Sequence, residues 1–368
     1  MSTLLAPASI GPRRGIRSAG NVLALPEARW NSRFLKATRG EAVDRTPIWL
    51  MRQAGRYMQH YRGIRSGTSF LGLCKDADLA TEVTVFAQQW LGVDAAIIFS
   101  DILVVLEALG LPLEFIGGEG PHLPRPICGP SDVDALGDPL QAAANLDYVY
   151  KAIRQTSAAL APDIPLIGFC GAPFTLASYA LEGGSSRQFA KTKAFMYREP
   201  DAWHRLSARL AATCAHYLNH QVAAGASCLQ IFDSWVGNLT RDDFREFVAP
   251  HLATLVSHVV DGVPVILFGT NTGHLIDLIR DCGADVVGLD GTVELGEARA
   301  LLGTQVAVQG NIDPTLLFAP RDRLAAATRD ILDQNAGRPG HIFNLAHGVL
   351  KETDPEMAKY LVELVHGG

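Results

Sequence analysis

The stretch that decides the fold is Pro47-Ile48-Trp49-Leu50-Met51-Arg52-Gln53-Ala54-Gly55-Arg56-Tyr57-Met58-Gln59-His60-Tyr61-Arg62-Gly63-Ile64-Arg65. It opens with a short apolar run typical of a buried strand, and a loop that carries four arginines follows at once. Arginine stays charged in proteins and presents a planar fork of donors, so the cluster indicates a site for a ligand with several carboxylates or phosphates. Charge count alone does not separate this site from a solvated basic loop paired with surface acids.

Apolar runs of strand length recur along the chain, and each ends in a polar or glycine-containing loop. They span residues 47–51, 95–99, 164–169, 227–232, 263–268, 284–289, 305–309 and 341–345. Amphipathic segments alternate with them, most clearly at 77–91, 200–223, 275–282 and 355–365.

This alternation predicts an α/β fold with a parallel sheet covered on both faces. Eight such units predict a single-domain (β/α)8 TIM barrel with its active site at the C-terminal ends of the strands. An open doubly wound sheet is the alternative, but it usually carries a glycine-rich phosphate turn after its first strand, and residues 52–56 do not form one. The proline- and glycine-rich stretch 111–138 is predicted to be a long excursion rather than a domain boundary.

Helix ends are marked by capping residues. For the last helix, Thr353 is the predicted N-cap, with Pro355 at the first helical position and Glu356 completing a capping box. Left-handed C-cap residues are predicted at the glycines that follow three helical segments, Gly92, Gly225 and Gly283.

Composition restricts the classes of function. The 368 residues are 48% hydrophobic and 19% charged, and no apolar run is long enough to cross a bilayer. The formal net charge of −6 argues against non-specific nucleic-acid binding, so the arginines act locally. The cysteines form no C-x-x-C pair or zinc-ligand spacing, which predicts free, mostly buried thiols and a cytoplasmic protein: Cys74, Cys128, Cys170, Cys214, Cys228 and Cys282.

The first 26 residues contain three arginines and no acidic residue. We expect residues 1–26 to form a disordered N-terminal extension, with an organelle-targeting segment as the alternative, and residues 27–368 to form the barrel domain.

Polar residues follow the apolar runs, and a barrel would gather them at one end. Asp101 sits within apolar sequence, so it is either the partner of an arginine or ligand, or a strand-end cap of the next helix. His347 fits a general acid, a donor to a ligand carboxylate or a core histidine, and the hydroxyls of Tyr179 and Ser234 are similarly ambiguous. The sequence contains no catalytic triad order, P-loop or metal-ligand spacing. The arginines, the buried carboxylate and the neutral hydrogen-bonding groups instead suit a site that binds a polyanion and stabilises a cation formed within it.

From about Asn31 to its C-terminus the chain resembles the uroporphyrinogen decarboxylase family of haem biosynthesis. The resemblance rests on six blocks of sequence: Pro47 to Tyr57, Phe99-Ser100-Asp101-Ile102-Leu103, Gly168 to Tyr179 with Glu182-Gly183-Gly184, Gln230-Ile231-Phe232-Asp233-Ser234-Trp235, Gln309-Gly310-Asn311-Ile312-Asp313-Pro314 and Phe343-Asn344-Leu345-Ala346-His347-Gly348. It implies a (β/α)8 barrel, usually a homodimer, that converts uroporphyrinogen III to coproporphyrinogen III and CO2 by decarboxylating four acetate side chains with neither cofactor nor metal.

The resemblance also implies the site residues. Its catalytic residues would be Asp101, Arg52, Arg56, Tyr179 and His347. Its substrate-binding residues would be Arg52, Gln53, Ala54, Gly55, Arg56, Arg65, Asp101, Phe169, Tyr179, Phe232, Ser234 and His347. The chain departs from the family pattern at Val236-Gly237, at Gly291, where tryptophan is frequent, and at Ala346, where glycine is usual. We expect the last two to reshape the barrel opening.

The implied chemistry needs an acceptor for the electron pair that each departing carboxyl group leaves. A pyrrole protonated at its α-carbon accepts it, and an ionised Asp101 would stabilise the resulting cation. Arg52 and Arg56 would hold peripheral carboxylates, while Tyr179, Ser234 and His347 orient the arms.

Two other functions are compatible with the same barrel. A corrinoid-linked methyltransferase of this superfamily would carry a thiolate-rich zinc site, and the usual His-x-Cys spacing is absent. A non-catalytic porphyrinogen-binding protein would be distinguished by a turnover assay.

Overall fold

The computed structural model describes residues 5–6, 25–117 and 120–367. The predicted extension at residues 1–26 therefore lies almost wholly outside the described residues. The main sheet is parallel, and its strands follow one another in chain order. They are β1 (Ala96–Ile97), β4 (Leu166–Gly171), β5 (Cys228–Asp233), β6 (Val265–Gly269), β7 (Val286–Gly288), β8 (Ala307–Gln309) and β9 (His341–Ile342).

The segment 47–50 closes this sheet into a barrel. Ile48 forms a parallel bridge with Phe343 beyond β9, and the Phe343 N–H donates to the Pro47 carbonyl (2.8 Å). On the other side, the N–H of Asp94, just before β1, donates to the Ile48 carbonyl (2.8 Å). All eight predicted runs thus form the wall of the barrel, and the (β/α)8 prediction is confirmed.

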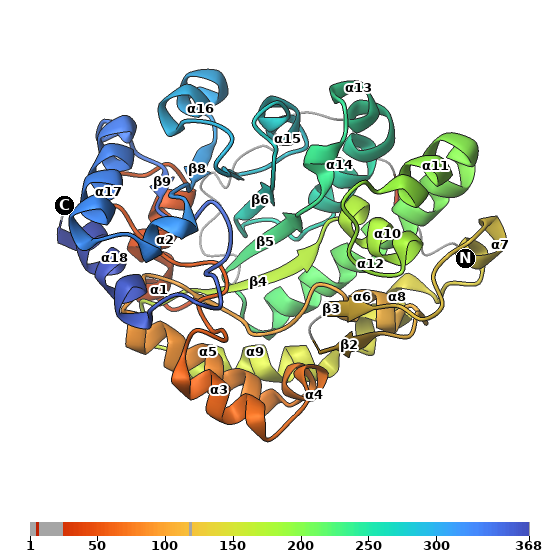
Figure 1. Ribbon diagram of the computed structural model, residues 1–368, viewed down its shortest axis with the longest axis horizontal. Coiled ribbons are helices and arrows are strands. Elements are labelled where there is room, and N and C mark those ends of the chain that lie inside the picture. The colour runs from red at the N-terminus through yellow and green to blue at the C-terminus, as the bar shows by residue number, and fades with distance from the viewer. Residues whose placement is uncertain (1–4, 7–24, 118–119, 368) are drawn as a thin grey trace.

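Helices surround the strands, which lie at the centre of the molecule (Figure 1). The longest is α12 (Pro200–Ala224), close to the predicted 200–223, and α5 (Ala77–Leu91) has the predicted bounds. The remaining helices are α1 (Glu27–Trp30), α2 (Arg33–Thr38), α3 (Gln59–Ser66), α4 (Phe70–Lys75), α6 (Val104–Ala108), α7 (Pro130–Asp134), α8 (Pro139–Ala144), α9 (Asp147–Ala159), α10 (Pro173–Glu182), α11 (Ala190–Arg198), η1 (Val236–Asn238), α13 (Arg241–Asp243), η2 (Phe244–Val248), α14 (Ala249–Ser257), α15 (Ile276–Asp281), α16 (Leu295–Leu302), η3 (Pro314–Phe318), α17 (Arg321–Asn335) and α18 (Pro355–Gly367).

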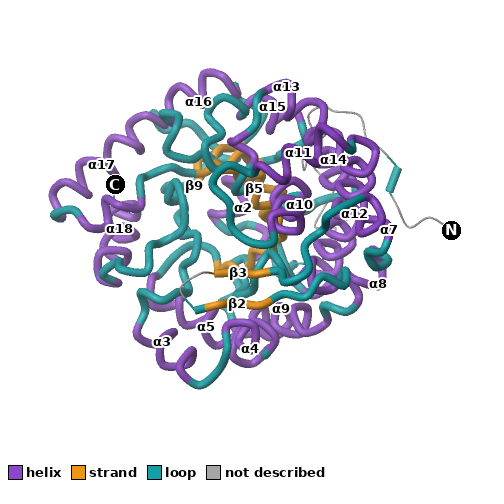
Figure 2. Tube along the Cα trace, turned by 45° about the vertical axis from the view of Figure 1, so that its right-hand side comes forward, coloured by secondary structure: helices purple, strands orange, loops and turns teal. Residues whose placement is uncertain are grey.

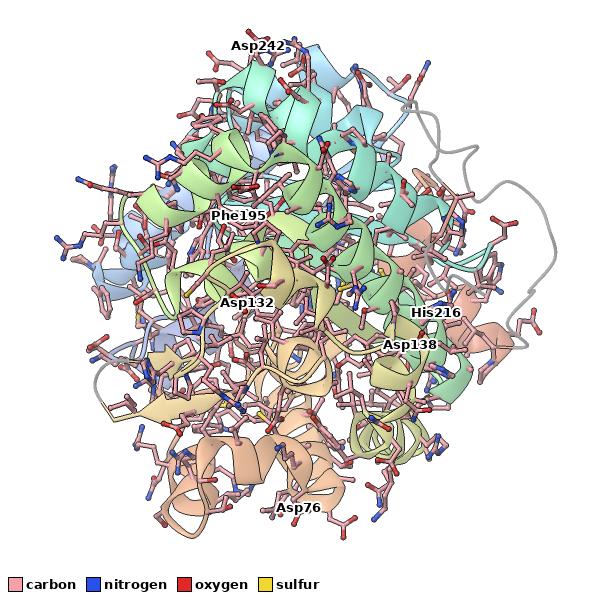
Figure 3. The ribbon with its side chains drawn as sticks, turned by 90° about the vertical axis from the view of Figure 1, so that its right-hand side faces the viewer. Asp76, Asp132, Asp138, Phe195, His216 and Asp242 are labelled. Atoms are coloured by element: carbon pink, nitrogen blue, oxygen red, sulfur yellow. The ribbon has the colours of Figure 1, made fainter. Side chains whose placement is uncertain are left out.

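Short polar side chains begin several of these helices, among them Asp76 and Asp138, which are labelled in Figure 3. Asp76 accepts hydrogen bonds from two backbone N–H groups at the start of α5 (3.0 and 3.1 Å), and Asp138 does the same for α8 (3.0 Å each). Such caps satisfy N–H groups that have no partner within the helix. The three glycines predicted as C-cap residues all have positive φ: Gly92 (71°), Gly225 (120°) and Gly283 (97°).

The predicted cap of the last helix is wrong by one residue. Asp354, not Thr353, caps α18, because its Oδ1 accepts from the Glu356 N–H (3.0 Å). The hydroxyl of Thr353 is buried and has no hydrogen-bond partner among the described residues. Aspartate and threonine are both good N-cap residues, so composition alone could not decide between neighbours.

The predicted excursion at 111–138 contains a hairpin of β2 (Glu114–Ile116) and β3 (Gly120–His122), separate from the main sheet (Figure 2). His122 bridges to Gly184, beyond α10, and the Leu123 N–H donates to the Gly183 carbonyl (2.9 Å). The hairpin is therefore attached to the end of α10. None of the helices within 25–117 and 120–367 has both the length and the apolar character that a bilayer crossing needs.

A chain of buried polar side chains crosses the barrel interior. The indole Nε1 of Trp49 donates to Gln309 Oε1 (2.8 Å), and Gln309 Nε2 donates to Gln230 Oε1 (3.1 Å). Gln309 lies on β8 and Gln230 on β5, which are not neighbours in the sheet, so this contact joins opposite walls. Apolar side chains fill the rest of the core.

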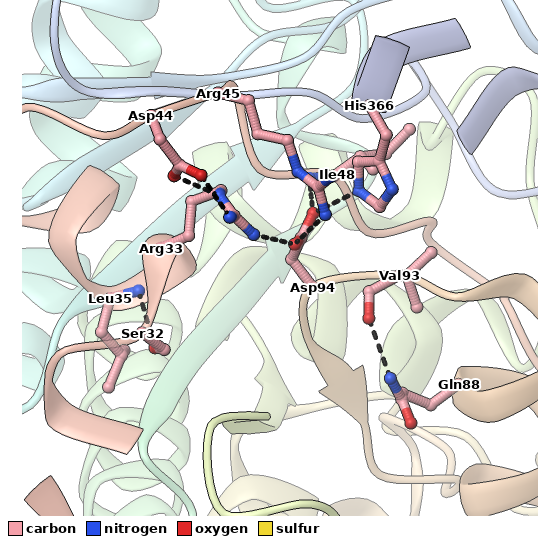
Figure 4. Close-up of polar contacts among 10 residues, drawn as sticks. All are labelled: Ser32, Arg33, Leu35, Asp44, Arg45, Ile48, Gln88, Val93, Asp94 and His366. Carbon is pink, nitrogen blue, oxygen red and sulfur yellow. Dashed lines mark hydrogen bonds and ion pairs between the residues drawn. The ribbon is translucent and has the colours of Figure 1, made fainter. Parts of the chain in front are cut away.

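At the N-terminal ends of the barrel strands, the buried carboxylate of Asp94 joins the start of the described chain to its last helix, α18 (Figure 4). Asp94 Oδ1 lies 3.1 Å from Arg33 and 3.8 Å from Arg45. Asp94 Oδ2 lies 2.8 Å from His366 Nε2 of α18 and accepts from the Ile48 N–H (2.9 Å). Burial alone would raise the pKa of Asp94, but these partners lower it below its usual value. The carboxylate thus holds the closing strand and the C-terminal helix in place.

Candidate active site

The closing strand leads directly into the arginine loop at the C-terminal end of the barrel. Arg52 takes the left-handed backbone conformation (φ 61°), which residues other than glycine rarely adopt. Side chains that donate to backbone carbonyls then hold the turn: the Tyr57 hydroxyl donates to the Gln53 carbonyl (2.6 Å), and the Arg62 guanidinium donates to the carbonyls of Arg56 (2.9 Å) and Tyr57 (2.8 Å). Arg52 therefore projects from a turn of defined shape.

The side chain of Arg52 lies against Gly348, in the loop that follows β9. A Cβ placed on Gly348 would lie 2.6 Å from Cγ and 2.9 Å from Nε of Arg52, with Cδ nearer still. Non-bonded carbon atoms pack at about 3.5 Å or more, so only glycine leaves room here. Burial lowers the pKa of Arg52, and the neighbouring Arg56 lowers it further, although the Arg52 side chain still reaches solvent. An arginine remains a cation at neutral pH under such conditions.

Asp101 follows β1 and lies within the electrostatic reach of Arg52. Its Oδ1 accepts from the Leu103 N–H (2.8 Å). None of the hydrogen bonds within residues 25–117 and 120–367 involves its Oδ2. Burial raises the pKa of Asp101 to about 6, against the opposing effects of that hydrogen bond and of Arg52. At pH 7 the carboxylate is thus mostly ionised and keeps one oxygen for a ligand.

The alternative role of Asp101 as a helix cap is not satisfied. The next helix, α6, begins at Val104 after Leu103, and no side chain caps it. Asp101 closes only a local turn through its Oδ1. Its second oxygen is left without a role in the fold.

Two neutral hydrogen-bonding groups lie within the electrostatic reach of Arg52 or Asp101. Tyr179 is on α10, after β4, and burial together with the charge of Asp101 raises its pKa. His347 follows β9, and burial together with the charge of Arg52 lowers its pKa. Both side chains are half-buried and uncharged at neutral pH. One cluster therefore gathers side chains that follow four different segments of the barrel wall: Arg52, Asp101, Tyr179 and His347.

Ser234 directly follows β5 and is half-buried. Its carbonyl accepts a hydrogen bond from the Thr270 hydroxyl, beyond β6. This contact ties the ends of β5 and β6 together and limits the positions that Ser234 can take.

Aromatic rings from three neighbouring strands pack edge to face. Phe169 of β4 and Phe232 of β5 have ring centroids 5.6 Å apart at 88°, and Phe232 and Phe268 of β6 are 6.1 Å apart at 77°. Phe169 and Phe232 were predicted to line the pocket, whereas Phe268 was predicted only as part of a strand. The three rings form a continuous apolar wall.

The other predicted binding residues differ in burial and in their contacts. Gln53 is fully buried, and neither its Nε2 nor its Oε1 has a hydrogen-bond partner among the described residues. Ala54 and Gly55 are half-buried loop residues, and Arg56 is exposed. The guanidinium of Arg65, on α3, donates to the Thr68 carbonyl. In this conformation Arg52 and Arg56 are thus better placed to meet a ligand than Gln53 or Arg65.

The described residues contain no group of three or more histidine, cysteine or acidic side chains that could hold a metal ion. All six cysteines are free thiols, and only Cys128 is exposed. Together with Arg56 and Ser234, the cluster offers two arginines, one carboxylate, two hydroxyls and an imidazole, which are groups that bind anions, accept N–H donors and orient polar arms.

Comparisons with known proteins show the family of this chain. A sequence model described as "Uroporphyrinogen decarboxylase (URO-D)" matches residues 29–368. The chain belongs to the uroporphyrinogen decarboxylase family. A relative from Myxococcus xanthus named "Uroporphyrinogen decarboxylase" is 51% identical over 339 residues, covering 91% of this chain and 96% of its own. A relative of the same name from Chloroflexus aurantiacus is 51% identical over 340 residues, covering 90% and 95%.

A solved structure, titled "methyltransferase from Methanosarcina mazei", shares the fold with a TM-score of 0.76. It is 21% identical in sequence and covers 91% of this chain and 97% of its own. At that identity the likeness supports the barrel and carries no argument about activity.

Not every polar residue at a strand end of this uroporphyrinogen decarboxylase fold belongs to the cluster. Asn311 Nδ2 donates to the carbonyls of Asp290 (2.6 Å) and Val293 (2.7 Å), and Asp290 Oδ2 accepts from the Thr272 N–H (3.2 Å). These side chains join the loops after β6, β7 and β8 to one another. The prediction that all strand-end polar residues would converge on one opening is therefore too broad.

Two of the three departures from the family pattern, Gly291 and Ala346, lie next to each other. A Cβ placed on Gly291 would meet only the Cβ of Ala346, at 3.7 Å. The space beside Gly291 is otherwise open. Gly348 and Trp235 lie in sequence blocks that pointed to this region, but their contacts with Arg52 and Tyr179 were not predicted, because they join distant parts of the chain.

Proposed function

We propose that this chain decarboxylates the four acetate side chains of uroporphyrinogen III without a cofactor and releases coproporphyrinogen III and CO2. Family membership makes the chain a decarboxylase of porphyrin biosynthesis. The observation that carries the proposed site is Asp101, a carboxylate beside Arg52 with one oxygen that the fold leaves unused.

Each decarboxylation replaces –CH₂–COO⁻ by –CH₃, so it consumes one proton and releases CO2. Protonation of the pyrrole at its α-carbon makes the ring cationic, and the ring then accepts the electron pair of the breaking C–C bond. In this mechanism Asp101 Oδ2 accepts hydrogen bonds from the pyrrole N–H groups and stabilises the cation. A charge held in place before the reaction begins contributes several kcal/mol, on the order of 3, to such a step.

Arg52 and Arg56 bind the peripheral carboxylates in the proposed complex. Guanidinium forks pair with carboxylates through two parallel hydrogen bonds, which sets the direction of the bound arm as well as its affinity. Tyr179, Ser234 and His347 donate to or accept from other arms and so present the reacting acetate to the protonated ring. Phe169 and Phe232 provide the apolar wall for the macrocycle.

We further propose that residues 27–368 act as a single catalytic domain, that the active protein is a homodimer and that it works in the cytoplasm. The match of the family to residues 29–368 supports the domain limits. The six free thiols support a reducing compartment.

Turnover under anaerobic conditions tests the proposal. Purified protein is mixed with chemically reduced uroporphyrinogen III and no added cofactor, and the products are oxidised and separated by carboxylate number. Conversion from eight carboxylates to four supports the decarboxylase. Binding without any loss of carboxylates would support the non-catalytic alternative instead.

A further inference from the structure

The fold keeps a second buried carboxyl group immediately beside the proposed site. Asp233 is the last residue of β5 and precedes Ser234. It is only 5% exposed, and burial raises its pKa to about 7. Its Oδ1 accepts from the Thr175 hydroxyl of α10 (2.7 Å), whereas its buried Oδ2 has no hydrogen-bond partner among the described residues. A buried carboxyl group of this kind is unfavourable for folding, which points to a different reason for its presence.

The Thr175 hydroxyl joins the two residues on either side of Ser234. It donates to Asp233 and accepts from the Trp235 N–H (3.3 Å). The end of β5 is therefore fastened to the first turn of α10 at two successive points. Ser234 lies between these points and cannot shift along the helix without breaking one of them.

The same helix carries Tyr179 one turn further on. The ring of Tyr179 packs on the indole of Trp235 with centroids 3.9 Å apart at 34°, and Phe189 packs on the same indole at 4.8 Å. In a helix, residues four apart lie on the same face, so Thr175 and Tyr179 both meet the segment after β5. The polar contact at Thr175 and the ring contact at Tyr179 thus act as a two-point clamp.

We propose that Asp233, Thr175 and Trp235 are positioning residues for the decarboxylation, because their clamp sets where the Tyr179 and Ser234 side chains stand relative to Asp101. The inference rests on the proposed roles of Tyr179 and Ser234. The clamp does not contact the arginine loop through any described hydrogen bond. It therefore governs the orientation of the reacting arm and leaves the binding of peripheral carboxylates to Arg52 and Arg56.

Paired variants at Thr175 test the clamp. Thr175→Val removes the hydroxyl and keeps the shape, whereas Thr175→Ser keeps the hydroxyl. Thr328→Val is the matched control, since Thr328 is a buried threonine on α17 whose hydroxyl donates only to the Leu324 carbonyl (2.9 Å). We expect Thr175→Val to lose about tenfold in kcat with KM changed by less than about threefold, and Thr175→Ser to retain most of the wild-type kcat.

A second readout separates positioning from loss of stability. Misplaced arms slow each decarboxylation, so Thr175→Val should release a larger share of products with five to seven carboxylates, and Thr328→Val should not. Trp235→Leu and Trp235→Phe make the same comparison at the ring contact with Tyr179, and we expect the phenylalanine variant to retain more activity. This second pair tests the clamp even if Thr175→Val fails to fold.

Wild-type kcat and product distribution in Thr175→Val, or equal losses in Trp235→Leu and Trp235→Phe, would overturn the clamp while leaving the proposed function standing. Absence of decarboxylation by the wild-type protein would overturn the proposed function and this role with it.

Discussion

Replacing Gly348 by alanine would displace the Arg52 side chain without replacing any proposed catalytic residue. The added Cβ would lie 2.6 Å from Arg52 Cγ and 2.9 Å from Nε, so the arginine must retreat by about 1 Å to restore normal contacts of about 3.5 Å. The atoms in the way all belong to the Arg52 side chain, so we expect the side chain to absorb the movement. A misplacement of about 1 Å costs up to about 100-fold in rate, and we expect kcat/KM for uroporphyrinogen to fall by about 10- to 100-fold.

Gly63→Ala is the matched control. Gly63 lies on α3, close to the arginine loop in sequence, and a Cβ there meets nothing within 4 Å. That variant should keep wild-type kinetics and gain about 0.5 kcal/mol or more in the free energy of unfolding, because alanine favours the helix. Steady-state kinetics and thermal unfolding of both variants make the comparison. Wild-type kcat/KM in folded Gly348→Ala would refute the packing of Arg52 against Gly348 as a requirement for catalysis.

Three further outcomes follow from the same contacts. Arg52→Lys should lower kcat/KM about tenfold or more although the charge is kept, since an ammonium group cannot pair with a carboxylate through two parallel bonds; unchanged kinetics would remove Arg52 from the site. Exhaustive chelation should leave turnover intact, because the described residues offer no metal-binding group, and loss of activity that added metal restores would contradict this. Asp94→Asn should lower the free energy of unfolding by about 3 kcal/mol at pH 7, as loss of a buried ionic partner does. Because the pKa of Asp94 is lowered in the folded state, its contribution is present above the unfolded value of about 3.9 and disappears as the pH falls through the folded value. The loss caused by Asp94→Asn in urea titrations should therefore shrink in acid, and an equal loss at pH 7 and pH 3 would contradict the assignment.

The barrel could be predicted from the sequence because its strands are buried on both sides. Such strands are continuous apolar runs, and each run is recognisable from its own residues. The closing segment 47–50 was recognised in this way although it pairs through a single bridge with Phe343. The ends of the four clearest helices were predictable to within two residues: the cap shifts from Thr353 to Asp354, and α18 runs to Gly367 rather than to residue 365.

The contacts that shape the site could not be predicted in this way. In the site, Gly348 makes room for Arg52, and at the opposite end of the barrel His366 reaches Asp94, a residue 272 positions away. The sequence around each partner gives no sign of such a contact, because the two residues meet only once the barrel has formed. The hairpin at 114–122 was also missed, since its strands are three residues long and half exposed.

The central claim is that Asp101 stabilises a cationic intermediate by its charge, and comparing Asp101→Asn with Asp101→Glu tests it most directly. Asparagine removes the charge and turns an N–H₂ group toward the pyrrole donors, whereas glutamate keeps the charge and displaces it by one methylene. Turnover of the same uroporphyrinogen preparation should fall about 100-fold or more in the asparagine variant and less in the glutamate variant. In the wild-type protein, turnover should also decline as the pH falls through about 6, where Asp101 takes up a proton. Near-normal turnover by Asp101→Asn would contradict the account and reduce Asp101 to the residue that closes the turn at Leu103.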